Sequence, residues 1–183
     1  MSKKAGYRSR ASLKLKEILK QDILIKKDMS VLDLGSFPGG WTQVIKENLG
    51  NEGIVIGVDL KKIKTIDGTF FIQKSITDLK DSDFQDFIQK LPFDLVLSDM
   101  APNISGIREA DNAQMIYLLD NVLSIMDNFL KKGGSTVIKV FQGETLDYTR
   151  KALGERFETC KVKKPSASRS NSKETYLIGK DFK

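Results

Sequence analysis

The chain has 183 residues, one cysteine, no histidine and a formal net charge of +6. The absence of histidine excludes Ser-His-Asp and Cys-His catalysis and most zinc sites, so we expect no metal, and the single cysteine excludes an internal disulfide. The length suits one α/β domain, and no apolar run approaches the ~20 residues of a membrane span.

Helical and extended patterns alternate along the chain. Apolar residues at helical spacing predict an amphipathic helix within residues 8–21. Further helices are predicted over 42–48, 84–90, 110–129 (ending at the basic and glycine residues 131–134) and 145–153. Strands are predicted at 31–34, 54–58, 69–73, 93–98, 135–141, 158–162 and 174–179. This order indicates a mostly parallel, seven-stranded sheet with helices on both faces and an antiparallel final pair at its edge.

A glycine-rich loop, Asp33-Leu-Gly-Ser-Phe-Pro-Gly-Gly-Trp41, joins the first strand to the next helix. Gly35, Gly39 and Gly40 let the backbone approach a ligand closely, and Pro38 stiffens the turn. The loop departs from the G-x-G-x-x-G of dinucleotide sites, which argues against a nucleotide-dependent dehydrogenase. Asp33 suits an ammonium or sulfonium better than a phosphate, so we predict S-adenosylmethionine as the cofactor. The alternative is a tight turn that binds nothing.

A second acid supports a nucleoside site. Asp59 ends the second strand at about the distance beyond the glycine loop where an acid hydrogen-bonds ribose hydroxyls. Taken alone, it could equally cap a helix. Together with the loop, it predicts a ribose contact.

Three polar residues stand at strand ends, where active sites of such sheets form. Lys139 interrupts the apolar fifth strand, where partial desolvation favours the neutral amine and calls for a carboxylate partner or a function. Asp99 follows the fourth strand and Glu174 opens the last one. The alternative for Lys139 is a lysine on an edge strand that reaches out to water. Asp99 could instead be a turn or helix-capping residue, and Glu174 an exposed charge on a strand.

Basic residues gather in the first twenty positions and again between 161 and 173. Such clusters favour polyanions, although each alone could be a solvated surface. Their position beside the strand-end residues favours nucleic acid, with Arg8, Arg10, Lys14, Lys164 and Arg169 as candidate RNA contacts. Since residues 1–7 lack a hydrophobic signal core, we expect a cytoplasmic protein.

The chain resembles the FtsJ (RrmJ) family of RNA ribose 2′-O-methyltransferases. The resemblance lies in segments 7–15, 33–43, 57–60, 97–106, 138–143 and 168–176, which follow the family's order. It implies a Rossmann-like methyltransferase fold over residues 1–183 as one domain, with the basic segment 1–22 contributing to RNA binding and to the active site. It also implies a catalytic tetrad formed by Lys14, Asp99, Lys139 and Glu174.

The resemblance extends to the cofactor. Together with the loop, it gives the expected contacts Asp33, Gly35, Phe37, Pro38, Gly39, Gly40, Trp41, Asp59, Leu60, Ser75, Ile76 and Asp99. One position departs from the family. Where relatives often carry an acid near the adenine amino group, this chain has Ser75, whose hydrogen bond should be weaker than that of a carboxylate. Asp78 is a possible substitute.

The family implies transfer of a methyl group from S-adenosylmethionine to a uridine ribose in large-subunit ribosomal RNA, by a protein expected to be a monomer. We expect Lys139 to act as general base or to steer the oxygen lone pair, Asp99 and Glu174 to orient its amine, and Lys14 to hold the substrate. The alternatives are methylation of the tRNA anticodon loop and a non-catalytic ribosome-assembly factor on the same scaffold.

Overall fold

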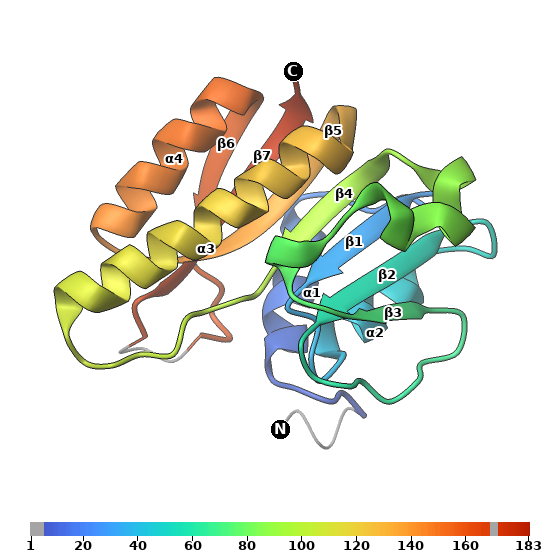
Figure 1. The fold of residues 1–183 in the computed structure, drawn as a ribbon, viewed down its shortest axis with the longest axis horizontal. Coiled ribbons are helices and arrows are strands. Elements are labelled where there is room, and N and C mark those ends of the chain that lie inside the picture. Colours follow the sequence, from blue (N-terminus) through green and yellow to red (C-terminus); the bar gives the residue numbers. More distant parts are fainter. Residues whose placement is uncertain (1–5, 169–171) are drawn as a thin grey trace.

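The computed structural model describes residues 6–168 and 172–183 as a single sheet covered by helices (Figure 1). The sheet has the order β3-β2-β1-β4-β5-β7-β6. Its strands are β1 (Ser30–Leu34), β2 (Ile54–Asp59), β3 (Phe70–Gln73), β4 (Phe93–Ser98), β5 (Leu130–Phe141), β6 (Phe157–Lys163) and β7 (Glu174–Phe182). The helices are α1 (Ala11–Gln21), α2 (Gly40–Asn48), α3 (Arg108–Phe129) and α4 (Glu144–Arg156), with 3-10 segments η2 (Ile76–Asp78) and η3 (Asp81–Lys90).

The predicted strand directions are confirmed. Strands β1 to β5 pair in parallel, whereas β7 is antiparallel to both of its neighbours, β5 and β6. The last strand in chain order therefore lies inside the sheet, and β6 forms the outer edge. This arrangement places the start of β7 beside the end of β5, because Glu174 pairs with Phe141 and Tyr176 pairs with Lys139.

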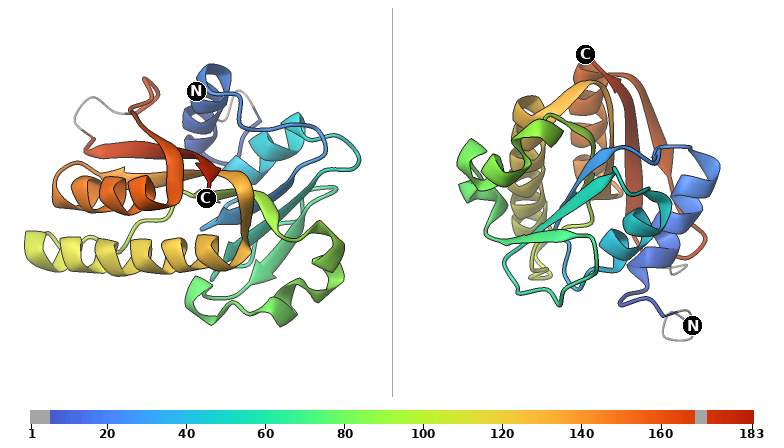
Figure 2. Two further views of the ribbon diagram at one scale, coloured as in Figure 1. Left: turned by 90° about the horizontal axis from the view of Figure 1, so that it is seen from above. Right: turned by 90° about the vertical axis from the view of Figure 1, so that its right-hand side faces the viewer.

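Two layers of helices cover the sheet. Helices α1 and α2 pack on one face and α3 and α4 on the other (Figures 1 and 2). The buried side of α3 shows the expected helical spacing, with Met115, Leu119, Val122 and Met126 all in the core. Strand β1 is buried along its whole length, as is usual for a central parallel strand covered on both faces. Among the described residues, no helix is both long and apolar enough to cross a membrane.

The structure differs from the sequence prediction at two places. Residues 131–134, predicted to end a helix, lie in β5, and α3 already ends at Phe129. Leu130 is buried and pairs with Phe93 before an irregularity in register, which Gly133 accommodates with a φ of +74°. The predicted helix at 84–90 is a longer 3-10 segment, and the Asp83 carboxylate at its start accepts the Lys80 N–H.

Candidate active site

The carboxyl ends of β1, β2 and β4 meet at one edge of the sheet and line a cavity of about 440 Å³. Its size is typical of a site for a cofactor-sized molecule. Predicted cofactor contacts contribute seven of its lining residues, namely Gly35, Phe37, Asp59, Leu60, Ser75, Ile76 and Asp99. Helix α3 closes the cavity with Tyr117, Leu118 and Asn121, which the sequence interpretation did not include.

The glycine loop is shaped by backbone conformation and by Asp59. Gly35 and Gly39 have φ values of +73° and +103°, and a Cβ at Gly35 would collide with the Met100 side chain. The two oxygens of the Asp59 carboxylate accept the N–H groups of Phe37 and Lys61, each at 2.9 Å. Asp59 thus ties the loop to the end of β2 beside the cavity.

Asp33 is fully buried in β1 and does not line the cavity. The Thr42 hydroxyl donates to its Oδ2 at 2.6 Å, while its Oδ1 has no hydrogen-bond partner. Burial, helped by the charges of Asp99 and Asp59, raises the pKa of Asp33 to about 7 against the opposing effect of the Thr42 hydrogen bond. Asp33 therefore packs behind the glycine loop, against Thr42 of α2.

Lys139 lies at the end of β5 and is only 7% exposed. Its Nζ is 3.3 Å from Asp99 Oδ1 and also donates to the Asp99 main-chain carbonyl. Because Asp99 lines the cavity, the amine stands at the border between the cavity and the β5–β7 side of the sheet. The desolvation and the carboxylate partner expected for Lys139 are both present.

Lys14 and Glu174 form a second lysine–carboxylate pair. The Lys14 Nζ, from α1, donates to Glu174 Oε2, at the start of β7, at 2.5 Å. Burial alone would raise the pKa of Glu174, but the Lys14 ammonium, with a smaller effect from Lys139, holds it below its usual range. The influence of Lys139 on Glu174 links the two pairs into one charged group.

Tyr176 connects the members of this group and was absent from the predicted site. Its hydroxyl donates to Asp99 Oδ1 at 3.0 Å, and the Lys14 Nζ lies 5.9 Å from the centre of its ring. Burial and the charge of Asp99 raise the pKa of the Tyr176 phenol, so the group remains a hydrogen-bond donor. Its position in β7, between Thr175 and Leu177, gave no sign in the sequence of this polar contact.

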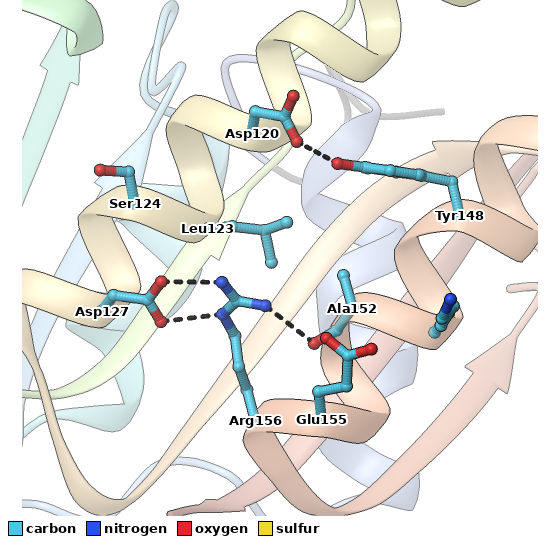
Figure 3. A pocket seen from close by; sticks show the side chains of 9 residues that line it. Asp120, Leu123, Ser124, Asp127, Tyr148, Ala152, Glu155 and Arg156 are labelled. Atoms are coloured by element: carbon cyan, nitrogen blue, oxygen red, sulfur yellow. Dashed lines mark hydrogen bonds and ion pairs between the residues drawn. The ribbon is translucent and has the colours of Figure 1, made fainter.

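A second cavity, of about 420 Å³, lies between α3 and α4 (Figure 3). Four of its polar side chains form two pairs. Arg156 binds Asp127 through two hydrogen bonds of 2.8 and 2.9 Å, and the Tyr148 hydroxyl donates to Asp120. No predicted site residue lines this cavity, so it carries none of the chemistry described above.

Comparison with known proteins decides the family. A family model for the FtsJ-like methyltransferases matches residues 7–182. The chain belongs to the FtsJ-like methyltransferase family. It is 42% identical to the ribosomal RNA large subunit methyltransferase E of Hahella chejuensis, and the match covers 100% of this chain and 89% of that protein. It is 45% identical to the protein of that name from Cellvibrio japonicus, with 97% and 84% of the two chains covered.

The fold agrees with this family assignment. A solved structure named as a ribosomal RNA methyltransferase from Plasmodium falciparum superposes with a TM-score of 0.86 at 29% identity, covering 96% of this chain and 98% of the other. The predicted Rossmann-like methyltransferase sheet with a reversed last strand is therefore confirmed. Family membership makes the chain a methyltransferase, so its reaction requires a methyl donor.

Several predicted cofactor contacts of the FtsJ-like loop also pack against the N-terminal segment. Gly40 and Trp41 begin α2, and neither lines the cavity, nor do Pro38 and Gly39. A Cβ at Gly40 would crowd the hydroxyls of Ser9 and Ser12, so its lack of a side chain lets the start of α2 approach the N-terminal segment closely. The Trp41 indole is 3% exposed and donates to the Ala11 carbonyl at 2.9 Å, which holds α1 in place.

The predicted RNA contacts differ in exposure and in their bonding partners. Arg10 and Lys164 are exposed, whereas Lys14 is paired with Glu174. The Arg8 guanidinium donates to the carbonyls of Pro38, Lys64 and Thr65, which ties the glycine loop to the β2–β3 connection. Arg169 lies outside the described residues. Arg8 therefore has a bracing role that charge alone did not reveal.

Ser75 takes part in a short chain of hydroxyls at the cavity wall. Its Oγ accepts the Thr77 N–H at 3.3 Å and is 2.8 Å from the Thr77 hydroxyl, which in turn donates to Asp78 at 3.2 Å. The Asp78 main-chain N–H donates directly to the Ser75 carbonyl at 3.1 Å, but its carboxylate is linked to the Ser75 hydroxyl through Thr77 and does not line the cavity.

Proposed function

We propose that the protein transfers a methyl group from S-adenosylmethionine to a ribose 2′-hydroxyl of RNA in the large ribosomal subunit. The observation that carries this proposal is the buried Lys139 amine beside Asp99, at the border of the cavity at the carboxyl edge of the sheet. A base at this position can take a proton from a hydroxyl placed next to a donor in the cavity. The tetrad implied by the family resemblance supplies the roles assigned below.

The residues present fit S-adenosylmethionine as the donor. Asp59 stands at the cavity where a ribose would need an acceptor, and Leu60, Ile76 and Leu118 provide apolar walls for an adenine. Ser75 replaces the adenine-facing acid common in the family with a hydroxyl. Asp59 and Asp99 line the cavity, and their carboxylates suit a ligand that carries positive charge. When bound, S-adenosylmethionine supplies a methyl group on a positively charged sulfur atom, ready for displacement by an oxygen.

Lys139 is assigned the role of base, or of the group that steers the hydroxyl lone pair. Its amine is fixed from two directions by Asp99, through the carboxylate and the main-chain carbonyl. Tyr176 donates to the same carboxylate oxygen and so limits how Asp99 can turn. Holding the amine in one position lowers the entropic cost of bringing the reacting oxygen into line.

Lys14 is assigned the role of substrate holder. Its ammonium is paired with Glu174 but retains 14% exposure of its side chain, so it can contact a phosphate or ribose at the mouth of the site. Since Lys14 belongs to α1, the N-terminal segment contributes to catalysis as well as to RNA contact. We assign the RNA-contacting surface to Arg10, Lys14 and Lys164, and treat residues 1–183 as one domain.

The substrate proposal is supported by the names of the relatives, which are ribosomal RNA large subunit methyltransferases. The test is transfer of labelled methyl groups from S-adenosylmethionine to large ribosomal subunits, free ribosomal RNA and tRNA in parallel. We expect label in the large subunit, in a linkage that resists alkali because the 2′-oxygen is blocked. Label in tRNA alone would show that tRNA is the substrate. If the protein neither transferred methyl groups nor bound the cofactor, it would be a non-catalytic assembly factor.

A further inference from the structure

Three lysine ammonium groups converge on one buried carboxylate at the far end of α1. Asp22, the residue after the last turn of α1, is 5% exposed. The Nζ atoms of Lys161 and Lys180 lie 3.6 and 3.4 Å from its Oδ1, and the Lys163 Nζ lies 3.4 Å from its Oδ2. We call these four residues the Asp22 lysine cluster.

The charges of the Asp22 lysine cluster do not balance. Burial alone would raise the pKa of Asp22, but the ammonium groups of Lys180 and Lys163 outweigh it and hold the pKa below its usual range. The ionised carboxylate therefore faces three positive charges. Among the described residues, no other acid lies within salt-bridge distance of these ammonium groups.

Neighbouring side chains do not supply the missing negative charge. The Gln21 amide oxygen accepts a hydrogen bond from Lys163 at 3.1 Å, but it is neutral. The Glu17 carboxylate, one turn earlier on α1, accepts hydrogen bonds from Ser166 and Ala167 instead. Like charges held a few ångströms apart repel, so the cluster is a ready-made site for one further anion.

The cluster is accessible, and its carboxylate directly follows α1, the helix that carries Lys14. The side chains of Lys161, Lys163 and Lys180 are 56%, 31% and 27% exposed. Asp22 follows Lys14 by eight residues, so at a rise of about 1.5 Å per residue the two positions are about 12 Å apart along the helix axis. A few nucleotides of one RNA strand can span this separation.

We infer that the Asp22 lysine cluster binds a backbone phosphate of the substrate RNA a few nucleotides away from the methylated ribose. This inference rests on the proposed function. The ammonium groups, gathered by the buried carboxylate, would receive the phosphate without having to be assembled during binding. The contact would position the RNA along α1 and would carry no information on base sequence.

The test compares two double variants that each remove two positive charges. Lys161→Ala with Lys180→Ala empties the cluster of its flanking lysines, whereas Arg150→Ala with Lys151→Ala removes two exposed cations from α4 on the other face of the sheet. Binding of a 20-nucleotide single-stranded RNA and of a trinucleotide is measured over a range of salt concentrations. Thermal unfolding and S-adenosylmethionine affinity are measured for each variant.

For the 20-nucleotide RNA, we expect the cluster variant to bind about three- to tenfold more weakly, with a salt slope shallower by about 0.7 for the lost phosphate contact. Trinucleotide binding, cofactor affinity and kcat on saturating ribosomal subunits should match wild type. The charge-preserving variant Lys161→Arg with Lys180→Arg should restore the binding and the slope. If the alanine variant is less stable, Lys161→Ala alone, at the most exposed lysine, serves as the second variant.

Equal binding and equal salt slopes for the cluster and α4 variants would overturn the inference and leave the proposed function standing. A loss that is as large for the trinucleotide as for the longer RNA would also overturn it, because the cluster would then act on the active site itself. If wild-type protein transferred no methyl group to RNA, the proposed function would fail instead.

Discussion

Two lysine–carboxylate pairs lie at the same edge of the sheet, and they are built differently. Lys139 and Asp99 come from the ends of the adjacent strands β5 and β4, and their side chains are 9% and 20% exposed. Lys14 and Glu174 come from a surface helix and from the start of β7, and theirs are 14% and 28% exposed. The first pair is held by the rigid sheet, and the second by the packing of α1 on it. On the proposed mechanism, the sheet therefore fixes the base and the helix carries the substrate holder.

This contrast predicts its largest effect at Lys139. Lys139→Ala should lower methyl transfer by about 10²- to 10⁴-fold, the usual contribution of a positioned base, while S-adenosylmethionine affinity stays within about twofold of wild type. Lys139→Arg keeps the charge but cannot accept a proton, so it should not rescue the rate. Labelled methyl incorporation and calorimetry give the two quantities. Near-normal transfer by Lys139→Ala, with the cofactor bound, would remove Lys139 from the mechanism.

Lys14→Ala should have a smaller effect of a different kind. Losing a charge-assisted contact worth about 1.5–3 kcal/mol should lower kcat/KM for RNA by roughly ten- to a hundredfold, mostly through KM. Initial rates over a range of RNA concentrations separate the two parameters. Combining Lys14→Ala with Glu174→Gln shows how much of the loss comes from leaving Glu174 unpaired. A fall confined to kcat would place Lys14 in the chemical step, and the two pairs would then no longer differ in their roles.

Asp33 extends the comparison to a carboxylate without a lysine. Its pKa of about 7 exceeds the ordinary value near 4, so between these pH values folding takes up a proton and stability falls as pH rises. Without cofactor, the free energy of unfolding of Asp33→Asn relative to wild type should rise by about 1.4 kcal/mol per pH unit across this window. The difference between the two proteins should not change with pH below pH 4 and should level off above pH 7. Chemical denaturation at a series of pH values measures this difference. Parallel stability profiles would show that Asp33 is ionised throughout.

The smallest effect is expected from Tyr176→Phe, which removes only the hydroxyl that bonds Asp99. A lost hydrogen bond worth about 1 kcal/mol predicts roughly a fivefold fall in kcat and a similar loss of folding stability. Cofactor affinity should be unchanged, since Tyr176 does not line the cavity. The comparison of kcat with cofactor affinity separates this positioning role from general damage to the fold, which would lower both.

Much of the fold could be predicted because its strands have local signals. Strand β4 was predicted with the bounds that the structure has, since the apolar run from Phe93 ends at a buried Ser98. The placement of β7 inside the sheet was not predicted, because spacing along the chain carries no information on the order of strands; the family resemblance implied only that the last strand is reversed. The start of β5 was missed because Gly133 and Gly134 are typical helix endings, and only the pairing of Leu130 with Phe93 shows them to be part of a strand.

The site was less predictable than the fold. Lys139 could be recognised in the sequence as a charge in an apolar strand. Lys14 and Glu174 are 160 residues apart, and only the family resemblance predicted that they belong to one site. Trp41 and Gly40 were predicted as cofactor contacts because they belong to the glycine-loop motif, and the motif gave no sign of their close contacts with residues 9–12. Tyr117 and Asn121 were missed because the sequence of a helix does not show whether a residue outside its buried face lines a cavity or faces solvent.

The position of β7 has a consequence for how the protein is made. A nascent chain that has emerged only as far as β6 has all the strands of the cavity but lacks both Glu174 and Tyr176. Its β5 and β6 edges, which β7 later joins, are still open at that stage. On the proposed mechanism, the active site is therefore complete only after the last strand has joined the sheet, because Glu174 and Tyr176 reach Lys14 and Asp99 as parts of β7.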